Sequence, residues 1–251
     1  MTKQFTRSDI DELTQRYRAN LINSLSGFKS ATLVGTTNGN TNNLAIVSSV
    51  VHVGANPPLL GMIMRPHTVV RDTLSNIKQQ GFYTLNHVST DWVDKAHQTS
   101  ARYAPDESEF EAVGLTPQFS ESFSAPFVKE SEIKMGLKVA QHFTLLNETE
   151  MVIGEIRELH MPENIIDKDG YADIEKANTA CISGLDSYHS TARIAQFAYA
   201  KPGVPLAKKW TWSRKNGLMI VIWRHHSEFY LIWIKWKYDI SFDLFSKRDS
   251  I

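Results

Sequence analysis

The feature that most constrains this chain is a series of short, β-branched runs in its first third, each ended by a turn signal. The runs lie at residues 31–37, 44–53, 59–64 and 82–86. Asn38-Gly39, a strong hairpin signal, separates the first two runs, and Asn56-Pro57-Pro58 ends the second. Short strands with few helices between them predict a mainly β fold.

The rest of the first 208 residues continues this pattern. We expect further strands at 131–139, 142–146 and 151–159. We expect an amphipathic helix from Ser8 to Gly27 that packs on a sheet or on a partner subunit, and shorter helices at 72–77, 91–104 and 173–181. Residues 105–127, rich in Pro, Ser and Glu, are expected to be irregular. The sequence therefore predicts one mainly β domain over 1–208, a β-barrel with peripheral helices.

Composition excludes several classes of function. Lys plus Arg and Asp plus Glu both number 27 in 251 residues, which gives no support for a nucleic-acid or anionic-membrane partner. No apolar run is long enough for a transmembrane helix, and the polar first residues argue against a secretory signal. The one cysteine, Cys181, excludes an intrachain disulfide and fits a cytoplasmic location. Packing is favoured over catalysis for that thiol.

Polar side chains gather where the strands of the first third end. Arg65-Pro66-His67-Thr68 follows a strand and offers a guanidinium, an imidazole and a hydroxyl, a set that suits a phosphate. Asn43, Ser48 and Ser49 lie along the preceding run, where strand alternation would put the two serines on opposite faces. Asn86-His87 closes the fourth run. Each group also has an ordinary structural interpretation, as a solvated turn or a loop cap.

A second polar group lies in the predicted helix at 91–104. Lys95, Thr99 and Arg102 would share one helix face, with Ser100 beside them, and could present charge to an anion. The nine histidines have no metal-ligand spacing, and there is no G-x-S-x-G, G-x-G-x-x-G or P-loop motif. The sequence thus offers a binding site with no separate catalytic residues and no metal.

The last part of the chain differs in kind. Five of the six tryptophans lie at 210–236, and the segments 218–223 and 230–236 could form strands. Residues 209–251 could be an accessory hairpin, a disordered apolar tail or the out-of-frame translation of a damaged gene end, and the third interpretation is slightly favoured.

In order and spacing, these pieces resemble the flavin-reductase-like family of FMN-binding split-barrel proteins, which includes flavoredoxin-like members. The resemblance covers about residues 5–205. It is carried by Asn43-Leu-Ala-Ile-Val-Ser-Ser49, Asn56-Pro-Pro-Leu59, Arg65-Pro-His-Thr68, Asp72-Thr73, Tyr83-Thr-Leu-Asn-His87, Ala96-His-Gln-Thr-Ser-Ala101, Ser108-Glu-Phe110, Ala125-Pro126, Gly184-Leu-Asp-Ser-Tyr188 and Tyr199-Ala-Lys-Pro202.

The resemblance implies a Greek-key split barrel, a homodimer, and FMN bound near the dimer interface. It places Ser48 and Ser49 at the flavin ring and Arg65, His67 and Thr68 at the phosphate. Asn86, His87 and Lys95 would lie close to the flavin, and Tyr188 or His189 could cover the ring. The implied activity is hydride transfer from NAD(P)H to bound FMN. An electron carrier that exchanges electrons with a redox partner protein, and a degenerate binding module, are the alternatives.

Overall fold

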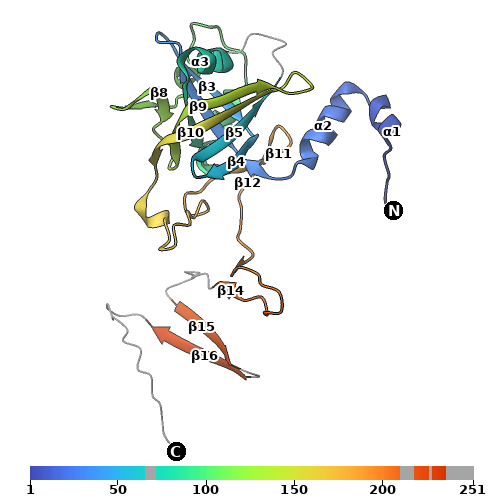
Figure 1. The fold of residues 1–251 in the computed structure, drawn as a ribbon, viewed down its shortest axis with the longest axis vertical. Coiled ribbons are helices and arrows are strands. Elements are labelled where there is room, and N and C mark those ends of the chain that lie inside the picture. Colours follow the sequence, from blue (N-terminus) through green and yellow to red (C-terminus); the bar gives the residue numbers. More distant parts are fainter. Residues whose placement is uncertain (66–71, 210–217, 226–227, 236–251) are drawn as a thin grey trace, which may run out of the picture. The chain divides into compact units, whose positions relative to one another are not determined.

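The computed structural model describes residues 1–65, 72–209, 218–225 and 228–235, the last two stretches and Lys209 by their backbone. Seven antiparallel strands form the main sheet, in the order β3-β2-β6-β9-β10-β5-β4 (Figure 1). They are β2 (Thr32–Thr37), β3 (Asn42–Val47), β4 (Val50–Ala55), β5 (Pro58–Met64), β6 (Phe82–His87), β9 (Lys134–Thr144) and β10 (Glu150–His160). The mainly β architecture is the predicted one.

The connection between β3 and β4 shows that this sheet is closed. β3 and β4 occupy the two ends of the strand order, yet only Ser48 and Ser49 separate them in the chain. In a flat sheet, seven strands would hold the edge strands roughly 29 Å apart. The chain from Val47 to Val50 can span only about 11 Å. The sheet must therefore curl until its edges meet, as in a split barrel.

The same connection corrects one prediction. The long strand expected at 44–53 is two strands, because the chain leaves one edge of the sheet and joins the other at Ser48-Ser49. The Ser49 carbonyl accepts a hydrogen bond from the Ile63 N–H at 2.9 Å, which attaches the corner to β5. By contrast, the hairpin at Asn38-Gly39 is confirmed: Thr37 pairs with Asn42, and Gly39 has a φ of +94°.

Several peripheral elements differ from the sequence-based expectation. The N-terminal helix is two helices, α1 (Arg7–Glu12) and α2 (Gln15–Leu25), neither with a buried residue. The helix expected at 91–104 is a turn of 3-10 helix, η1 (Thr90–Trp92), followed by α4 (Val93–Gln98). Residues 105–127 are not irregular, since they form α5 (Glu109–Val113), β7 (Pro117–Ser120) and much of β8 (Phe123–Val128). The two strands expected at 131–139 and 142–146 are one strand, β9, which runs from Lys134 to Thr144.

The remaining elements complete the body of the chain. The helix predicted at 72–77 is α3 (Asp72–Gln80), and a second 3-10 turn is η2 (Glu163–Ile165). Strands β1 (Lys29–Ser30), β11 (Cys181–Ser183) and β12 (Ser187–His189) form a small sheet. The helix predicted at 173–181 is absent; instead the Asp173 carboxylate accepts hydrogen bonds from the N–H groups of Glu175 and Lys176 in a turn. No helix in the described residues is long and apolar enough to cross a membrane.

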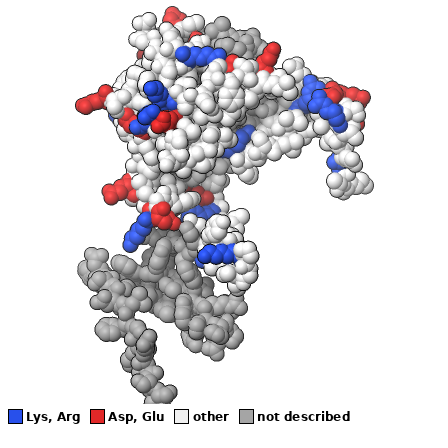
Figure 2. Space-filling view, viewed as in Figure 1, with Lys and Arg blue, Asp and Glu red and all other residues white. Residues whose placement is uncertain are grey.

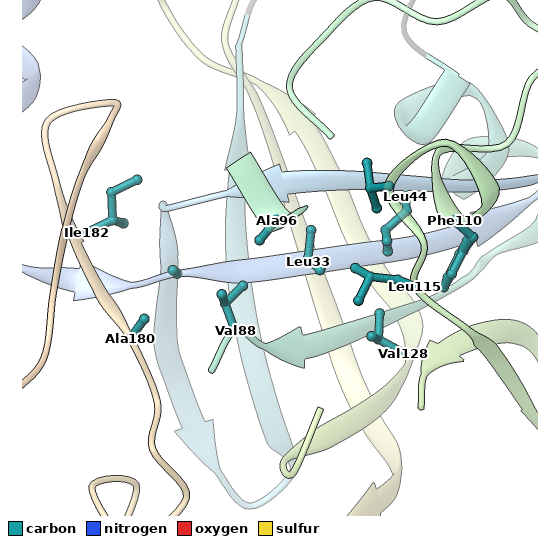
Figure 3. Packing of buried hydrophobic residues seen from close by; sticks show 11 residues of the cluster. Leu33, Leu44, Val88, Ala96, Phe110, Leu115, Val128, Ala180 and Ile182 are labelled. Carbon is teal, nitrogen blue, oxygen red and sulfur yellow. The ribbon is translucent and has the colours of Figure 1, made fainter. Parts of the chain in front are cut away.

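The two largest of four buried clusters fill most of the body. The first joins the sheet to α4, α5 and the small sheet, and Figure 3 shows Leu33 and Leu44 packed with side chains from those elements. The second lies between β2, β5, β6, β9, β10 and α3, around Tyr83 and Leu137. Both clusters include side chains of β2 and β6, so these two strands are packed on both of their faces. The residues at the ends of the two strands therefore have fixed positions.

Tyr83 carries the one buried side-chain polar atom that has no hydrogen-bond partner among the described residues. Its side chain is fully buried, its hydroxyl lies against Gly154, and burial raises the pKa of the phenol. We predict that Tyr83→Phe raises the free energy of unfolding by about 1 kcal/mol, because it removes an unsatisfied polar group. Urea unfolding would measure this. Tyr103→Phe removes a hydroxyl that is bonded to Gln98 and should give no such gain.

The chain divides into two compact units after Ala192. The second unit contains β13 (Gln196–Phe197) paired with β14 (Lys208–Lys209), and β15 (Leu218–His225) paired with β16 (Glu228–Lys235). The two predicted tail strands therefore pair as an antiparallel hairpin. The predicted boundary at residue 208 and the origin of the tail stay predictions.

Candidate functional site

Three predicted contacts lie at or near the corner where the barrel closes. The side chains of Ser48 and Ser49 are half-buried, and neither hydroxyl forms a hydrogen bond with another described residue. Arg65 follows directly on β5 and is exposed, and its guanidinium likewise pairs with no described carboxylate. The bond from Ile63 to Ser49 ties this end of β5 to the corner. Two hydroxyls and a cation are thus available to a ligand in one region.

The two serines lie outside any strand, so the alternation rule does not apply to them. The continuous strand assumed for them is therefore absent, and the prediction that they face opposite sides stays a prediction. His67 and Thr68, the other predicted phosphate contacts, lie outside the described residues.

Asn43 and Asn86 are engaged inside the protein. The Asn43 amide donates to the Glu109 carboxylate and accepts from the hydroxyls of Thr36 and Thr73. The Asn86 amide donates to the Leu33 carbonyl and accepts from the Val128 N–H. These bonds use the polar atoms of both amides. A direct contact of either side chain with a flavin stays a prediction.

His87 is a half-buried histidine at the end of β6. Its Nδ1 lies 3.3 Å from the Thr179 hydroxyl, and its carbonyl accepts from the Ser131 hydroxyl at 2.7 Å. Burial lowers the pKa of its imidazole from 6.5 to about 4, because the charged form is poorly solvated there. At neutral pH this side chain is therefore an uncharged hydrogen-bonding group.

This shift predicts a pH dependence of stability. The unfolded chain binds a proton at His87 below about pH 6.5, whereas the folded chain does so only near pH 4. The neutral His87 side chain therefore contributes to the free energy of unfolding above pH 6.5. This contribution, up to about 3 kcal/mol, is lost as the pH falls toward 4. From pH 7 to pH 4, the unfolding free energy of the wild type should fall more steeply than that of His87→Gln, by up to the same amount.

A control separates this effect from general acid destabilisation. His52, on β4, is exposed. In His52→Gln, the free energy of unfolding should depend on pH as it does in the wild type. If His87→Gln also showed that same dependence, the loss of stability at low pH could not be assigned to His87.

Lys95, Thr99 and Arg102 do not form the predicted common face, because α4 ends at Gln98. The Lys95 ammonium donates to the Gly114 carbonyl at 2.9 Å. The Thr99 hydroxyl is buried and donates to the Ala96 carbonyl at the helix end, while Ser100 is exposed. The structure gives Lys95 and Thr99 bonds within the chain and leaves Ser100 open to a ligand.

Tyr188 joins the small sheet to α4. Its hydroxyl lies 3.0 Å from His97 Nδ1, and the two rings meet edge to face. Burial, and then the nearby Asp186 carboxylate, raise the pKa of Tyr188 to about 12, so the phenol is neutral. The adjacent His189 bonds instead to the Ser183 hydroxyl at 2.9 Å. Sequence reasoning did not foresee the Tyr188–His97 contact, which depends on tertiary packing.

The residues present fit an anionic ligand with a polar ring edge. Ser48 and Ser49 offer hydroxyls, Arg65 a cation, and His87 a neutral imidazole. Acidic and basic side chains are interspersed on the face shown in Figure 2, without a large area of one sign. With a formal net charge of zero, the chain depends on a local cation, such as Arg65, to provide charge for a phosphate.

The chain belongs to the flavin reductase like domain family, which matches residues 25–180. The closed β-barrel and its peripheral helices are the split barrel of that family. The predicted fold and family are thereby confirmed. The family also makes this a flavin-binding protein, of a class whose members include oxidoreductases.

Known proteins similar to this one span most of the body. A split-barrel protein of Shewanella frigidimarina NCIMB 400, assigned to the flavin reductases, is 51% identical with a TM-score of 0.76, over 79% of this chain and 100% of that one. Nitrilotriacetate monooxygenase component B of Bacillus cereus shares the fold at 24% identity and a TM-score of 0.69, over 77% and 97% of the two chains. Bacillus subtilis YwrF is 28% identical over 60% of this chain and 76% of its own.

Proposed function

We propose that this protein binds FMN at the Ser48–Arg65 corner and reduces it with hydride from NADH or NADPH. The observation that carries the proposal is the pairing of unengaged hydroxyls at Ser48 and Ser49 with the exposed cation of Arg65. Membership of the flavin reductase like family supports it.

The proposed roles follow from the chemistry of each group. Ser48 and Ser49 would donate hydrogen bonds to the polar edge of the flavin ring. Arg65, with His67 and Thr68, would bind the phosphate, since a guanidinium matches its oxygens in charge and geometry. His87 is neutral and could donate or accept beside the ring. Bound FMN would supply the hydride-accepting chemistry, and the chain would orient the ring and exclude water from one face.

The test uses the full-length protein. Acid release of any bound chromophore should yield FMN, and the apoprotein should bind added FMN. Under anaerobic stopped-flow conditions, NADH or NADPH should bleach the flavin absorbance rapidly. A colourless protein that does not bind added FMN would overturn the proposal. Slow bleaching by both nucleotides, with fast reduction by a ferredoxin-like protein, would instead establish the electron carrier.

We also propose that the protein is a homodimer. The two N-terminal helices bury no residue against their own chain, although α2 and the segment after it carry exposed apolar side chains at Tyr17, Ile22, Leu25 and Phe28. Exposed apolar surface of this kind is typical of a protein interface. Analytical ultracentrifugation of the full chain should give twice the monomer mass, and a monomer at micromolar concentration would contradict the proposal.

A further inference from the structure

One side of the barrel, formed by β4, β5, β10 and β9, presents apolar side chains to the outside. These four strands are neighbours in the main sheet (Figure 1). Met62 and Val152 belong to the second buried cluster, so the residues next to them in their strands point outward. Phe143 lies directly opposite Met151 and shares its face. We call this surface the outer barrel face and define it by Val51, Val53, Ile63, Phe143 and Met151.

The side chains of the outer barrel face lie together and not as separate exposed residues. Met151 on β10 is directly opposite Ile63 on β5. The side chains of Met151, Val53 and Val51 converge over Gly61. Their methyl carbons lie 3.0, 3.2 and 3.3 Å from the position that a Cβ atom of Gly61 would take. Side chains from β4, β5 and β10 therefore form one continuous apolar area.

Solvent reaches this area in the single chain. Val51, Val53 and Phe143 are 49%, 42% and 40% exposed. The solvated face of an antiparallel sheet usually carries polar residues, so an apolar one is typical of a surface that another element covers.

The helix α2 has the complementary deficiency. Tyr17, Leu21 and Leu25 follow one another at intervals of four residues and form an apolar stripe along the helix, which Phe28 extends. A helix with such a stripe normally buries it, yet α2 buries no residue, and Leu25 is 71% exposed. In the single chain, then, the stripe and the outer barrel face do not cover each other.

The two surfaces match in length. The 11 residues of α2 extend for about 16 Å along the helix axis. From β4 to β9 the outer barrel face crosses three spacings between strands, about 14 Å. A helix lying across these strands would therefore cover the apolar area with its stripe.

We propose that the outer barrel face of each subunit receives α2 of the other subunit in a homodimer. This inference rests on the homodimer proposed above and identifies the two surfaces that meet. In a two-fold symmetric dimer the contact occurs twice. Two stripes and two faces of roughly 300 Å² each bury about 1,200 Å², which reaches the size of a stable interface. Contact between the two α2 stripes alone would bury about half of that area, which is too little.

The dissociation constant of the dimer tests both surfaces. Analytical ultracentrifugation would measure it for full-length wild type, Leu25→Glu and Val51→Glu. Both residues are exposed in the single chain, so the variants should fold, and each places a charge in an apolar contact that occurs twice. Each should raise the dissociation constant by about tenfold or more. Phe119→Glu is the matched control, because Phe119 is also exposed but lies in β7, outside both surfaces. It should dimerise as wild type does.

Cross-linking identifies the chain that supplies the helix. In a Cys181→Ala background, Leu25→Cys and Val51→Cys would be introduced into separate, differently tagged full-length chains. A short bis-maleimide should join the two kinds of chain after mixing, and should not do so when Phe119→Cys replaces Val51→Cys. If both cysteines are placed in one chain and the cross-linked product has the mass of a monomer, α2 packs on its own barrel and the proposal is wrong.

The outcomes separate this inference from the homodimer itself. A wild-type chain that is monomeric would contradict both. A stable wild-type dimer that is weakened by Leu25→Glu and not by Val51→Glu would overturn only the inference, because α2 would then dock on a different surface.

Discussion

Replacing Arg65 by glutamine is expected to weaken FMN binding by about ten- to a hundredfold, the largest effect on the ligand of any single exposed residue. A charged hydrogen-bond donor to a phosphate contributes about 1.5–3 kcal/mol, which corresponds to this range. The effect should be smaller at high salt, because an exposed charge is screened. Fluorescence titration with FMN at two salt concentrations would measure it.

Stability gives the first control for this prediction. Arg65 is exposed and forms no ion pair with a described residue, so the thermal midpoint of Arg65→Gln should equal that of wild type. Arg157→Gln removes another exposed guanidinium, near the far end of β10, where it pairs with Glu155. It should bind FMN as wild type does. Equal weakening in both variants would indicate a general charge effect and contradict a phosphate contact at Arg65.

The largest expected effect on stability comes from Gly35→Ala. Gly35 lies in β2, where β8 crosses so closely that a Cβ atom would overlap the Pro126 carbonyl oxygen. The same Cβ would lie 2.5 Å from the Thr84 hydroxyl oxygen, which donates to that carbonyl at 2.6 Å. Because the obstacle is backbone, β8 must move away from the sheet. We expect a loss of about 3 kcal/mol or more in the free energy of unfolding, measured by urea denaturation.

Gly54→Ala is the control for this strand glycine. Gly54 lies in β4 of the same sheet, and the nearest atom to its Cβ position is the Pro57 carbonyl oxygen at 3.4 Å. The change should alter the free energy of unfolding by less than about 1 kcal/mol. A similar loss in both variants would show that strand glycines are sensitive in general, and that the approach of β8 is not the cause.

Local sequence patterns predicted the parts of the fold that depend on local forces. The hairpin at Asn38-Gly39 and the ends of β5 and β10 follow from turn residues and β-branched runs. The order of the motifs predicted the family. The corner at Ser48-Ser49 could not be read from the residues, because a continuous β-branched run looks the same whether its strand stays in one edge of a sheet or passes to the other.

The internal hydrogen bonds of the candidate site were not predicted from the sequence, for a physical reason. Asparagines at 43 and 86 are equally able to bind a ligand or to satisfy buried groups, and the difference depends on what packs over them. In this chain α5 brings Glu109 to Asn43, and β8 brings the Val128 N–H to Asn86. Both elements lie within or beside the segment predicted as irregular. The error in secondary structure therefore concealed the internal hydrogen-bond partners of both amides.

The two-residue connection at Ser48-Ser49, between the edge strands β3 and β4, also has a consequence for folding. Ser48 and Arg65 are connected locally by the pairing of β4 with β5, but closure of the barrel around them requires β10 to pair with β5, and β10 is formed by residues 150–160. The closed barrel at this corner therefore depends on contacts of high sequence separation, which form late and slowly. A nascent chain that has emerged only as far as α5 contains every residue of the corner but lacks the strand that closes the barrel.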